Sequence, residues 1–351
     1  MRKFKKAILV NKCYSDNLGD QAIAQSANKL LKELGFIDVC CHDYTSKASS
    51  VLNRKQTKGQ GSLKSKVKQL LPLKLIWTIL NVKRIHQTLN VSDSKYLFIG
   101  GGQLVLSNTY FPIAAFLWVF IAKRLGYTCI YLNVGAGTKF TRLDERLFNY
   151  SLKKSDLILV RDDETKEILD NKFGVRSYLT GDVVFTEKKE RERSLIRTKT
   201  VGVAIPGLYV FNTYNDKLTR DAYFEKWLGF LEENKIDLND VELFHTTYDD
   251  LVESRLFSKY VLGKYKVKLD IKEASDINTL NNILNNYGIV ISGRMHALIM
   301  GIQLGCKPLV FPISEKLISF QSIIDKEKNL DFYSDCVRTK TLSQLSELIR
   351  V

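Results

Sequence analysis

The chain has 351 residues, 45% of them hydrophobic and 26% charged, and its formal net charge is +15 at pH 7. This length accommodates two domains with a sizeable core each, and the composition is that of a soluble globular protein without repeats or low-complexity tracts. The six cysteines show no CxxC spacing and mostly lie in apolar runs, as small core residues do. No signal peptide begins the chain, so we expect a cytoplasmic protein. The longest apolar stretch, residues 111–122, is too short to span a bilayer and predicts a buried helix.

Between Asp43 and Asp93 the chain carries ten lysines and arginines and no acidic residue. Apolar residues and Trp77 interleave with the basic ones over residues 63–80, which predicts an amphipathic element on an anionic lipid surface. The alternative is a solvated basic loop followed by an ordinary packed helix. Nucleic acid is not an expected partner, because the chain has neither an aromatic RNA-binding signature nor a base-reading motif.

The chain opens with a buried strand at residues 7–10 and a polar loop that ends in Asn17-Leu18-Gly19-Asp20. A helix is predicted over residues 21–34, with Gly35 as its stop. Strand, loop and helix in this order are typical of a mononucleotide-binding fold. The GxGxxG pattern is missing, so no dinucleotide site is predicted.

Three glycines, Gly100 to Gly102, and then Gln103 follow a predicted strand at residues 96–99. Glycines at this place let the backbone approach a ligand closely, or let two elements pack closely. The alternation continues with strands at residues 39–42, 129–134, 157–160 and 177–179 and helices at residues 143–154 and 163–172.

The charged residues 187–199 are predicted to link an N-terminal domain, residues 1–186, to a C-terminal domain, residues 200–351. The first domain includes the basic insertion at about residues 45–90. In the second, strands at residues 200–205, 242–245 and 266–269 alternate with helices at residues 217–233, 249–262 and 276–285. Two such series predict an α/β protein of two Rossmann-like domains facing a cleft.

Residues 289–311 form the most informative stretch. A strand at residues 289–291, a turn at Ser292-Gly293-Arg294 and a helix at residues 295–304 are predicted, and a further strand begins at Pro308. Helix N-termini at the carboxyl ends of parallel strands attract anions. Arg294 suits a carboxylate or phosphate, and His296 can exchange a proton near neutral pH. The alternative for His296 is an ordinary capping or packing histidine.

Several motifs in order resemble the polysaccharide pyruvyl transferase family: Asn17-Leu18-Gly19-Asp20, Gly100-Gly101-Gly102-Gln103-Leu104, Val160-Arg161-Asp162-Asp163-Glu164-Thr165, Thr180-Gly181-Asp182 and Ser292-Gly293-Arg294-Met295-His296. The resemblance implies a GT-B-like pair of domains. It also implies transfer of pyruvate from phosphoenolpyruvate onto a sugar as a ketal, during synthesis of bacterial surface polysaccharide such as exopolysaccharide or capsule. The family's arginine-x-histidine element matches Arg294 and His296, and its downstream lysine matches Lys316. Met295 stands where the family commonly has leucine, and the usual aromatic residue before Lys316 is missing.

This chemistry requires an acid/base group and an anion clamp, for which we assign His296 and Arg294. Ser292, Gly293, Lys316 and His245, which ends a predicted strand, are assigned to the donor side. The acceptor side is expected to hold Asn17, Gly19, Asp20, Gly101, Gly102 and Gln103. Asp20 could instead only cap the first helix.

The second interpretation is a GT-B-type glycosyltransferase that uses a nucleotide sugar, which the fold permits. No two aspartates are separated by a single residue, so the DxD motif is absent, and we expect neither a metal nor a cofactor. A third interpretation is a non-catalytic protein that binds a membrane surface or nucleic acid through its charge. The expected partners are phosphoenolpyruvate, a lipid-linked oligosaccharide as sugar acceptor, and the anionic inner face of the plasma membrane.

Overall fold

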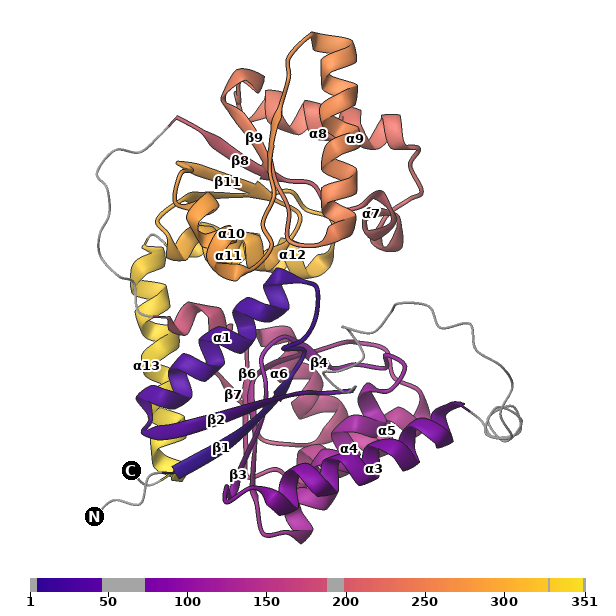
Figure 1. Cartoon of the computed structure of the whole chain (residues 1–351), viewed down its shortest axis with the longest axis vertical. Coiled ribbons are helices and arrows are strands. Elements are labelled where there is room, and N and C mark those ends of the chain that lie inside the picture. The colour runs from indigo at the N-terminus through magenta and orange to yellow at the C-terminus, as the bar shows by residue number, and fades with distance from the viewer. Residues whose placement is uncertain (1–4, 46–72, 188–198, 328, 350–351) are drawn as a thin grey trace. The chain divides into compact units, whose positions relative to one another are not determined.

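A computed structural model describes residues 5–45, 73–187, 199–327 and 329–349 (Figure 1). The expected linker lies almost wholly outside these residues. So does most of the basic insertion, including Lys64, Lys66 and Lys68. The chain forms two compact units: unit 1 comprises Met1–Tyr14, Ile23–Thr186 and Cys336–Val351, and unit 2 comprises Ser15–Ala22 and Glu187–Asp335.

The units differ from the expected domains in two segments. One is Ser15–Ala22, which belongs to unit 2 because its helix start is hydrogen-bonded to the loop at Thr246. The other is Cys336–Val351, which belongs to unit 1, where Asn133 donates to the hydroxyl of Thr341 at 3.2 Å. Hydrophobic periodicity predicts that an element exists but not which sheet it covers, so neither assignment could be made from the sequence.

The sheet of unit 1 is parallel throughout, with strand order β2-β1-β3-β5-β6-β7 and with β4 paired to β5 outside this path. Its strands are β1 (Lys5–Asn11), β2 (Phe36–Asp43), β3 (Tyr96–Gly100), β4 (Gln103–Val105), β5 (Thr128–Ala136), β6 (Leu157–Val160) and β7 (Tyr178–Leu179). Apart from β4 this is the flavodoxin-like order, in which the direction of chain progression reverses between β1 and β3.

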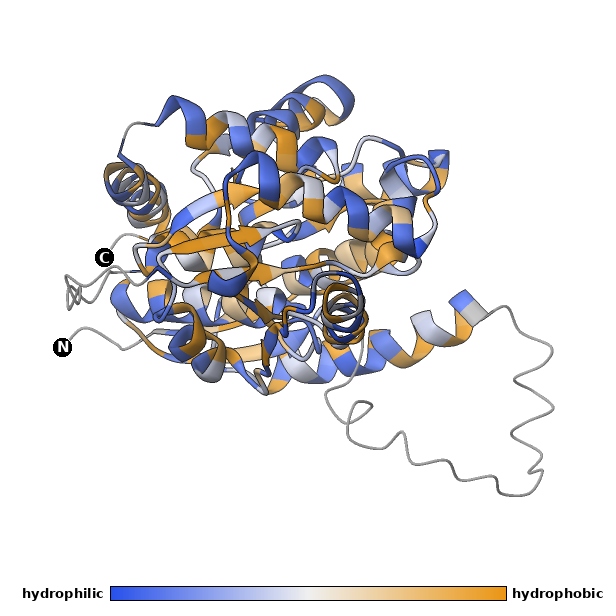
Figure 2. Cartoon of the chain, turned by 90° about the horizontal axis from the view of Figure 1, so that it is seen from above, coloured by the Kyte–Doolittle hydropathy of each residue, from blue (hydrophilic) through white to orange (hydrophobic). Residues whose placement is uncertain are grey.

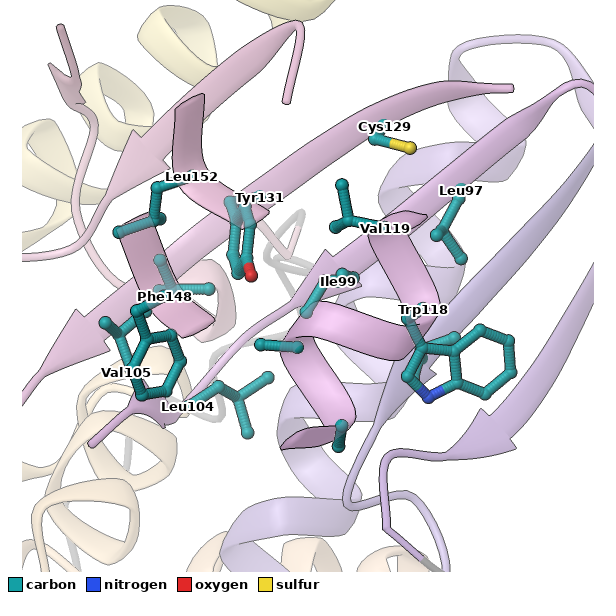
Figure 3. Packing of buried hydrophobic residues seen from close by; sticks show 14 of the residues in the cluster. Leu97, Ile99, Leu104, Val105, Trp118, Val119, Cys129, Tyr131, Phe148 and Leu152 are labelled. Atoms are coloured by element: carbon teal, nitrogen blue, oxygen red, sulfur yellow. The ribbon is translucent and has the colours of Figure 1, made fainter. Parts of the chain in front are cut away.

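The helices of unit 1 are most of α1 (Leu18–Glu33) and of α13 (Leu330–Ile349), together with α3 (Leu73–Val91), α4 (Phe111–Arg124), α5 (Arg142–Lys154) and α6 (Asp163–Ile168), which continues as the π-helix Leu169–Phe173. The prediction of a buried helix at residues 111–122 is confirmed by α4. Its fully buried Trp118 donates from Nε1 to the Tyr44 carbonyl at 3.1 Å. Figure 3 shows Trp118 and Val119 packed beside Leu97 and Ile99 of β3 in the core of unit 1.

Unit 2 has a parallel sheet of five strands in the order β10-β9-β8-β11-β12, so its chain progression reverses between β8 and β11. The strands are β8 (Val201–Ala204), β9 (Val241–Phe244), β10 (Asp270–Lys272), β11 (Ile289–Ser292) and β12 (Lys307–Val310). The helices are α7 (Leu208–Tyr214), α8 (Arg220–Glu233), α9 (Tyr248–Tyr265), α10 (Ile277–Leu284), α11 (Met295–Gln303) and α12 (Glu315–Lys326). In the core, Trp227 stacks on Phe311 with ring centroids 3.8 Å apart.

The expected α/β class with two Rossmann-like, GT-B-like units is confirmed by these two sheets. The strand predicted at residues 266–269 is wrong. Helix α9 continues to Tyr265, Lys266 ends it in a left-handed conformation (φ 61°), and the strand begins only at Asp270. None of the described helices is both long and apolar enough to cross a lipid bilayer.

Gly101 and Gly102 after β3 both have φ near 72°, which favours glycine. A Cβ on Gly101 would lie 1.9 Å from Cγ2 of Ile23 in α1. Of the two sequence interpretations, close packing therefore explains Gly101, and no ligand is needed to account for it.

We expect Gly101→Ala to lower the free energy of unfolding by about 1–3 kcal/mol more than Gly126→Ala does, because overpacking adds to the backbone strain. Gly126 is the matched control, with φ 76° and no atom within 4 Å of a Cβ. Urea unfolding measures both variants. In a double-mutant cycle, Gly101→Ala should cost less stability in the Ile23→Ala background than in the wild type, because the clashing methyl group is gone. Equal losses at the two glycines would contradict the packing account.

Candidate active site

The loops after β8 and β11 lie side by side, because β8 and β11 are neighbours whose carboxyl ends meet at the point where unit 2 reverses. A Cβ on Gly293 would lie 2.8 Å from Cγ of Pro206, so the two loops touch and the turn requires glycine. The hydroxyl of fully buried Ser292 accepts a hydrogen bond from the Arg294 amide at 2.8 Å and donates to the Ala204 carbonyl at 3.3 Å. Ser292 and Gly293 therefore fix the direction in which Arg294 leaves the sheet.

Arg294 is held by Asp250 of α9 through two hydrogen bonds. Nη2 donates to Oδ1 at 2.6 Å and Nε donates to Oδ2 at 3.1 Å. Burial by itself lowers the pKa of Arg294, but the charge of Asp250 and these hydrogen bonds outweigh it and raise the pKa, so the guanidinium stays charged. Asp250 does not engage Nη1, and the Tyr209 hydroxyl also interacts with the guanidinium. Nη1 is the part of Arg294 that can bind a further anion.

Asp250 is fully buried, and its carboxylate also accepts hydrogen bonds from the Gly207 amide and the Thr246 hydroxyl, both at 3.2 Å. A buried charge with this many partners is well satisfied, so it can act as a fixed support. The sequence interpretation missed Asp250. The available signal was the Thr247-x-x-Asp250 pattern, in which Thr247 caps α9, and this signal predicts a helix start but not a partner for the carboxylate.

Two more carboxylates at the start of α9 fix the loop after β8. Glu253 accepts from the Leu208 amide at 2.9 Å and from Nε of Arg220 at 3.0 Å. The exposed Tyr209 donates its hydroxyl to Asp249 at 3.1 Å. The first two turns of α9 thus fix both Arg294 and the segment that follows β8.

His296 lies in the first turn of α11, half-buried. A Cβ on Gly19 would lie 3.0 Å from Cβ of His296 and 3.1 Å from its Nδ1, so the backbone of the first turn of α1 passes directly against the imidazole. Arg294, which precedes α11, makes no side-chain hydrogen bond to cap it, and the first turn has no acidic residue. The first amides of α11 therefore suit an anion.

The loop before α1 belongs to the same unit as Arg294 and His296. The Leu18 amide donates to the Thr246 carbonyl at 2.9 Å, and the Gly19 amide donates to Oδ1 of Asn17 at 2.9 Å. Asn17 is therefore the residue that caps α1, and Asp20 lies half-buried in the first turn. The expectation that Asn17, Gly19 and Asp20 come from a different domain than His296 is corrected here.

The two remaining donor-side candidates lie at the same edge of the unit 2 sheet. His245 follows β9, is buried, and accepts a hydrogen bond from the Ala274 amide at Nε2 (3.2 Å). Burial lowers its pKa, so His245 is neutral at pH 7. Lys316 lies half-buried in the first turn of α12, which follows β12, the neighbour of β11.

Gly101, Gly102 and Gln103 belong to unit 1, where Gln103 ties β4 to β5 by donating from Nε2 to the Ala136 carbonyl at 2.9 Å. Asn11, which ends β1 at the reversal point of this sheet, was missed. Its side chain is 1% exposed, and neither of its polar atoms has a hydrogen-bond partner among the described residues. Such an amide suits a small polar ligand or an ordered water.

Two of the motifs noted in the sequence have structural roles in unit 1. The Arg161 guanidinium lies against Gly135, where a Cβ would come within 2.5 Å of Cζ, and its Nε donates to Asp162 at 2.8 Å. Asp162 also caps α6. In the Thr180-Gly181-Asp182 motif, the Gly181 carbonyl accepts from Asn133 at 2.7 Å. These motifs support the sheet and do not by themselves form a site.

Comparison with known proteins gives both a family and a fold. The model of the polysaccharide pyruvyl transferase family matches residues 17–315. The chain is similar to the solved UDP-GlcNAc 2-epimerase of Methanocaldococcus jannaschii at 12% identity, covering 93% of this chain and 94% of that one with a TM-score of 0.52. It is similar to the UDP-GlcNAc 2-epimerase of Neisseria meningitidis bound to UDP-GlcNAc at 11% identity, covering 99% and 100% with a TM-score of 0.52. At such identities the likeness shows the fold alone. No curated protein matches the chain.

The burial of the Arg294–Asp250 pair predicts that breaking it lowers stability more than breaking an exposed ion pair does. We expect Arg294→Ala to lower the free energy of unfolding by about 3 kcal/mol, because it leaves the buried Asp250 charge without its partner. Arg255→Ala is the matched control, since its pair with Glu273 is half exposed on both sides and should contribute less than about 1 kcal/mol. Urea unfolding compares the two variants, and similar small losses would show that Asp250 does not depend on Arg294.

His245 predicts a pH dependence of stability. Its folded pKa lies below the usual 6.5, so below pH 6.5 the unfolded chain binds the proton more readily than the folded one. The stability that neutral His245 contributes is complete above pH 6.5 and is lost as the pH falls toward the folded pKa. The melting temperature of the wild type should therefore fall more steeply between pH 7 and pH 5 than that of His245→Asn. Equal slopes would count against a lowered pKa of His245, because this side chain is the only difference between the two proteins.

Proposed function

The chain belongs to the polysaccharide pyruvyl transferase family, and we propose that it transfers pyruvate from phosphoenolpyruvate onto a sugar of a bacterial surface polysaccharide precursor as a ketal. The observation that carries this proposal is the Arg294 guanidinium, fixed by buried Asp250 beside the uncapped start of α11 and two residues before His296. This arrangement provides an anion site and a proton-exchanging group at one strand end. The donor has a carboxylate and a phosphate and must exchange protons as it reacts.

The proposed reaction adds two sugar hydroxyl oxygens to C2 of phosphoenolpyruvate. The methylene carbon C3 takes a proton and becomes a methyl group, C2 becomes oxocarbenium-like, and the bond between C2 and the phosphate oxygen breaks. The two hydroxyls release two protons. One proton is transferred to C3, and the other is taken up by the departing phosphate. His296 exchanges these protons, while the Nη1 side of Arg294 and the first amides of α11 bind the donor's anionic groups.

The acceptor, in this proposal, is a lipid-linked oligosaccharide in the cytoplasm at the inner face of the plasma membrane, and no metal or cofactor takes part. Gly19 lies against His296, and Asp20 is the next residue of the same helix turn in unit 2, so these two are the acceptor-side residues that we favour. The roles of Lys316 and His245 on the donor side remain predictions. His245 is the weaker candidate for proton exchange, because its Nε2 is already engaged by a backbone amide.

A nucleotide-sugar glycosyltransferase is the second candidate, and the fold likeness to a UDP-GlcNAc-bound epimerase favours testing it. The deciding experiment incubates the protein with phosphoenolpyruvate and a panel of lipid-linked and nitrophenyl sugars, followed by mass spectrometry. A mass gain of one pyruvate ketal with release of phosphate is expected. Thermal stabilisation by UDP or GDP sugars but not by phosphoenolpyruvate would favour the second candidate instead.

His296 should be required for turnover but not for folding. We expect His296→Gln to lower turnover by roughly 10²–10⁴-fold with little change in melting temperature, and Arg294→Lys mainly to raise KM for phosphoenolpyruvate, because lysine cannot bind an anion in a planar, two-pronged way. Steady-state kinetics and thermal melts measure both effects. Wild-type turnover in His296→Gln would remove His296 from the mechanism.

Gly19 should be required because it leaves room for the imidazole. Gly19→Ala forces His296 to move by a few tenths of an ångström, and since a displacement of 1 Å can cost about 10²-fold in rate, we expect turnover to fall by up to about tenfold. Gly229→Ala in α8 is the control, because no atom lies within 4 Å of a Cβ there. Unchanged kinetics in Gly19→Ala would mean that the first turn of α1 does not position His296.

A further inference from the structure

Helices α3 and α4 of unit 1 form a groove of about 610 Å³ on the surface, lined mainly by apolar side chains, including Ile79 and Val82 of α3 and Phe120 of α4. Lys83 and Arg124 lie at its edges, and the Arg124 guanidinium sits 4.2 Å from the ring centroid of Phe120. Neither helix contains a single aspartate or glutamate. The groove is thus apolar inside and positive at its rim, and the proposed reaction does not use it.

Helix α3 has two different faces. Trp77 stacks on Tyr110 at a centroid distance of 4.7 Å and donates from Nε1 to the Thr45 carbonyl at 2.9 Å, while Ile85 and Leu89 are buried in the core. Trp77 therefore anchors α3 to its own unit.

The outer face of α3 carries Leu75, Ile79 and Val82, which lie on one side of the helix at spacings of four and three residues, and Leu80 is exposed farther round the helix. Ile79 is 58% exposed and Leu80 is 62% exposed. Figure 2 shows hydrophobic and hydrophilic residues alternating along this helix. Exposed aliphatic side chains next to an apolar groove mark an interaction surface more than scattered surface residues do.

We propose that the α3–α4 surface docks onto an anionic phospholipid bilayer. The aliphatic side chains of α3 lie among the lipid hydrocarbon chains, the groove takes one such chain, and Lys83 and Arg124 contact lipid phosphates. Exposed aliphatic side chains flanked by basic residues bind the membrane interface in this way. The proposal does not depend on pyruvyl transfer.

Charge favours lipid over the other possible occupants. Residues 46–72, which precede α3, contain seven lysines and arginines and no acidic residue, so their net charge has the same sign as Lys83 and Arg124. A second copy of the chain brings another net charge of +15. An anionic bilayer complements Lys83 and Arg124 by charge, and its interior complements the exposed aliphatic side chains of α3.

Cosedimentation of the full chain with vesicles tests the proposal. We expect binding to vesicles of phosphatidylglycerol and phosphatidylcholine but not to phosphatidylcholine alone. The variants Ile79→Gln/Leu80→Gln and Lys83→Gln/Arg124→Gln should each lower the partition coefficient by about tenfold or more, since both apolar insertion and charge contribute. If docking were purely electrostatic and used other residues, Ile79→Gln/Leu80→Gln would bind the vesicles as tightly as the wild type does.

Leu143→Gln and Lys153→Gln on α5 are matched controls, and Leu143 is 60% exposed, close to Leu80. They should bind as the wild type does, and thermal melts should be the same for all variants because every substituted side chain is exposed. Wild-type binding by either double variant, or equal binding to both kinds of vesicle, would overturn the proposal. The proposal would also be overturned if sedimentation analysis showed a dimer that Ile79→Gln/Leu80→Gln abolishes. In that case a second copy of the chain, not lipid, would cover the α3–α4 surface.

Discussion

The ion pair between Arg294 and Asp250 is the interaction on which the candidate site depends. Asp250 is buried and accepts four hydrogen bonds, two from Arg294 and one each from the loops after β8 and β9. The same carboxylate thus joins the loops after three neighbouring strands, β9, β8 and β11, at the carboxyl edge of the unit 2 sheet. Because the guanidinium is held on one side, it can offer the other side to a ligand without losing its orientation.

The remaining features of the site follow from the parallel sheet. Reversal of the chain between β8 and β11 brings two loops together, and Gly293 allows their contact where any side chain would meet Pro206. The next residues open α11 at the same edge, and Gly19 allows the first turn of α1 to pack against His296. Arginine, helix start and histidine are therefore positioned by backbone geometry, while the carboxylates of α9 fix that geometry by hydrogen bonds.

Periodicity in the sequence was sufficient for the local structure here: the turn at Ser292-Gly293-Arg294, the helix after it and the buried α4 all occur where they were expected. Three things could not be derived in this way. Asp250 lies 44 residues before Arg294, so no local pattern pairs them. The start of α1 belongs to unit 2 and α13 mostly to unit 1, which depends on tertiary packing. Lys266 ends α9 in a left-handed conformation that its residue type does not signal.

The proposed reaction is tested most directly by carrying it out in deuterium oxide with phosphoenolpyruvate and an accepted sugar. Protonation of C3 by an exchangeable group predicts a ketal whose methyl group contains one deuterium, measured by mass spectrometry of the product and by its methyl NMR signal. His296→Gln should form this product far more slowly. A ketal without deuterium would contradict protonation at C3, and a product in which a sugar has been transferred in place of pyruvate would contradict the proposed function itself.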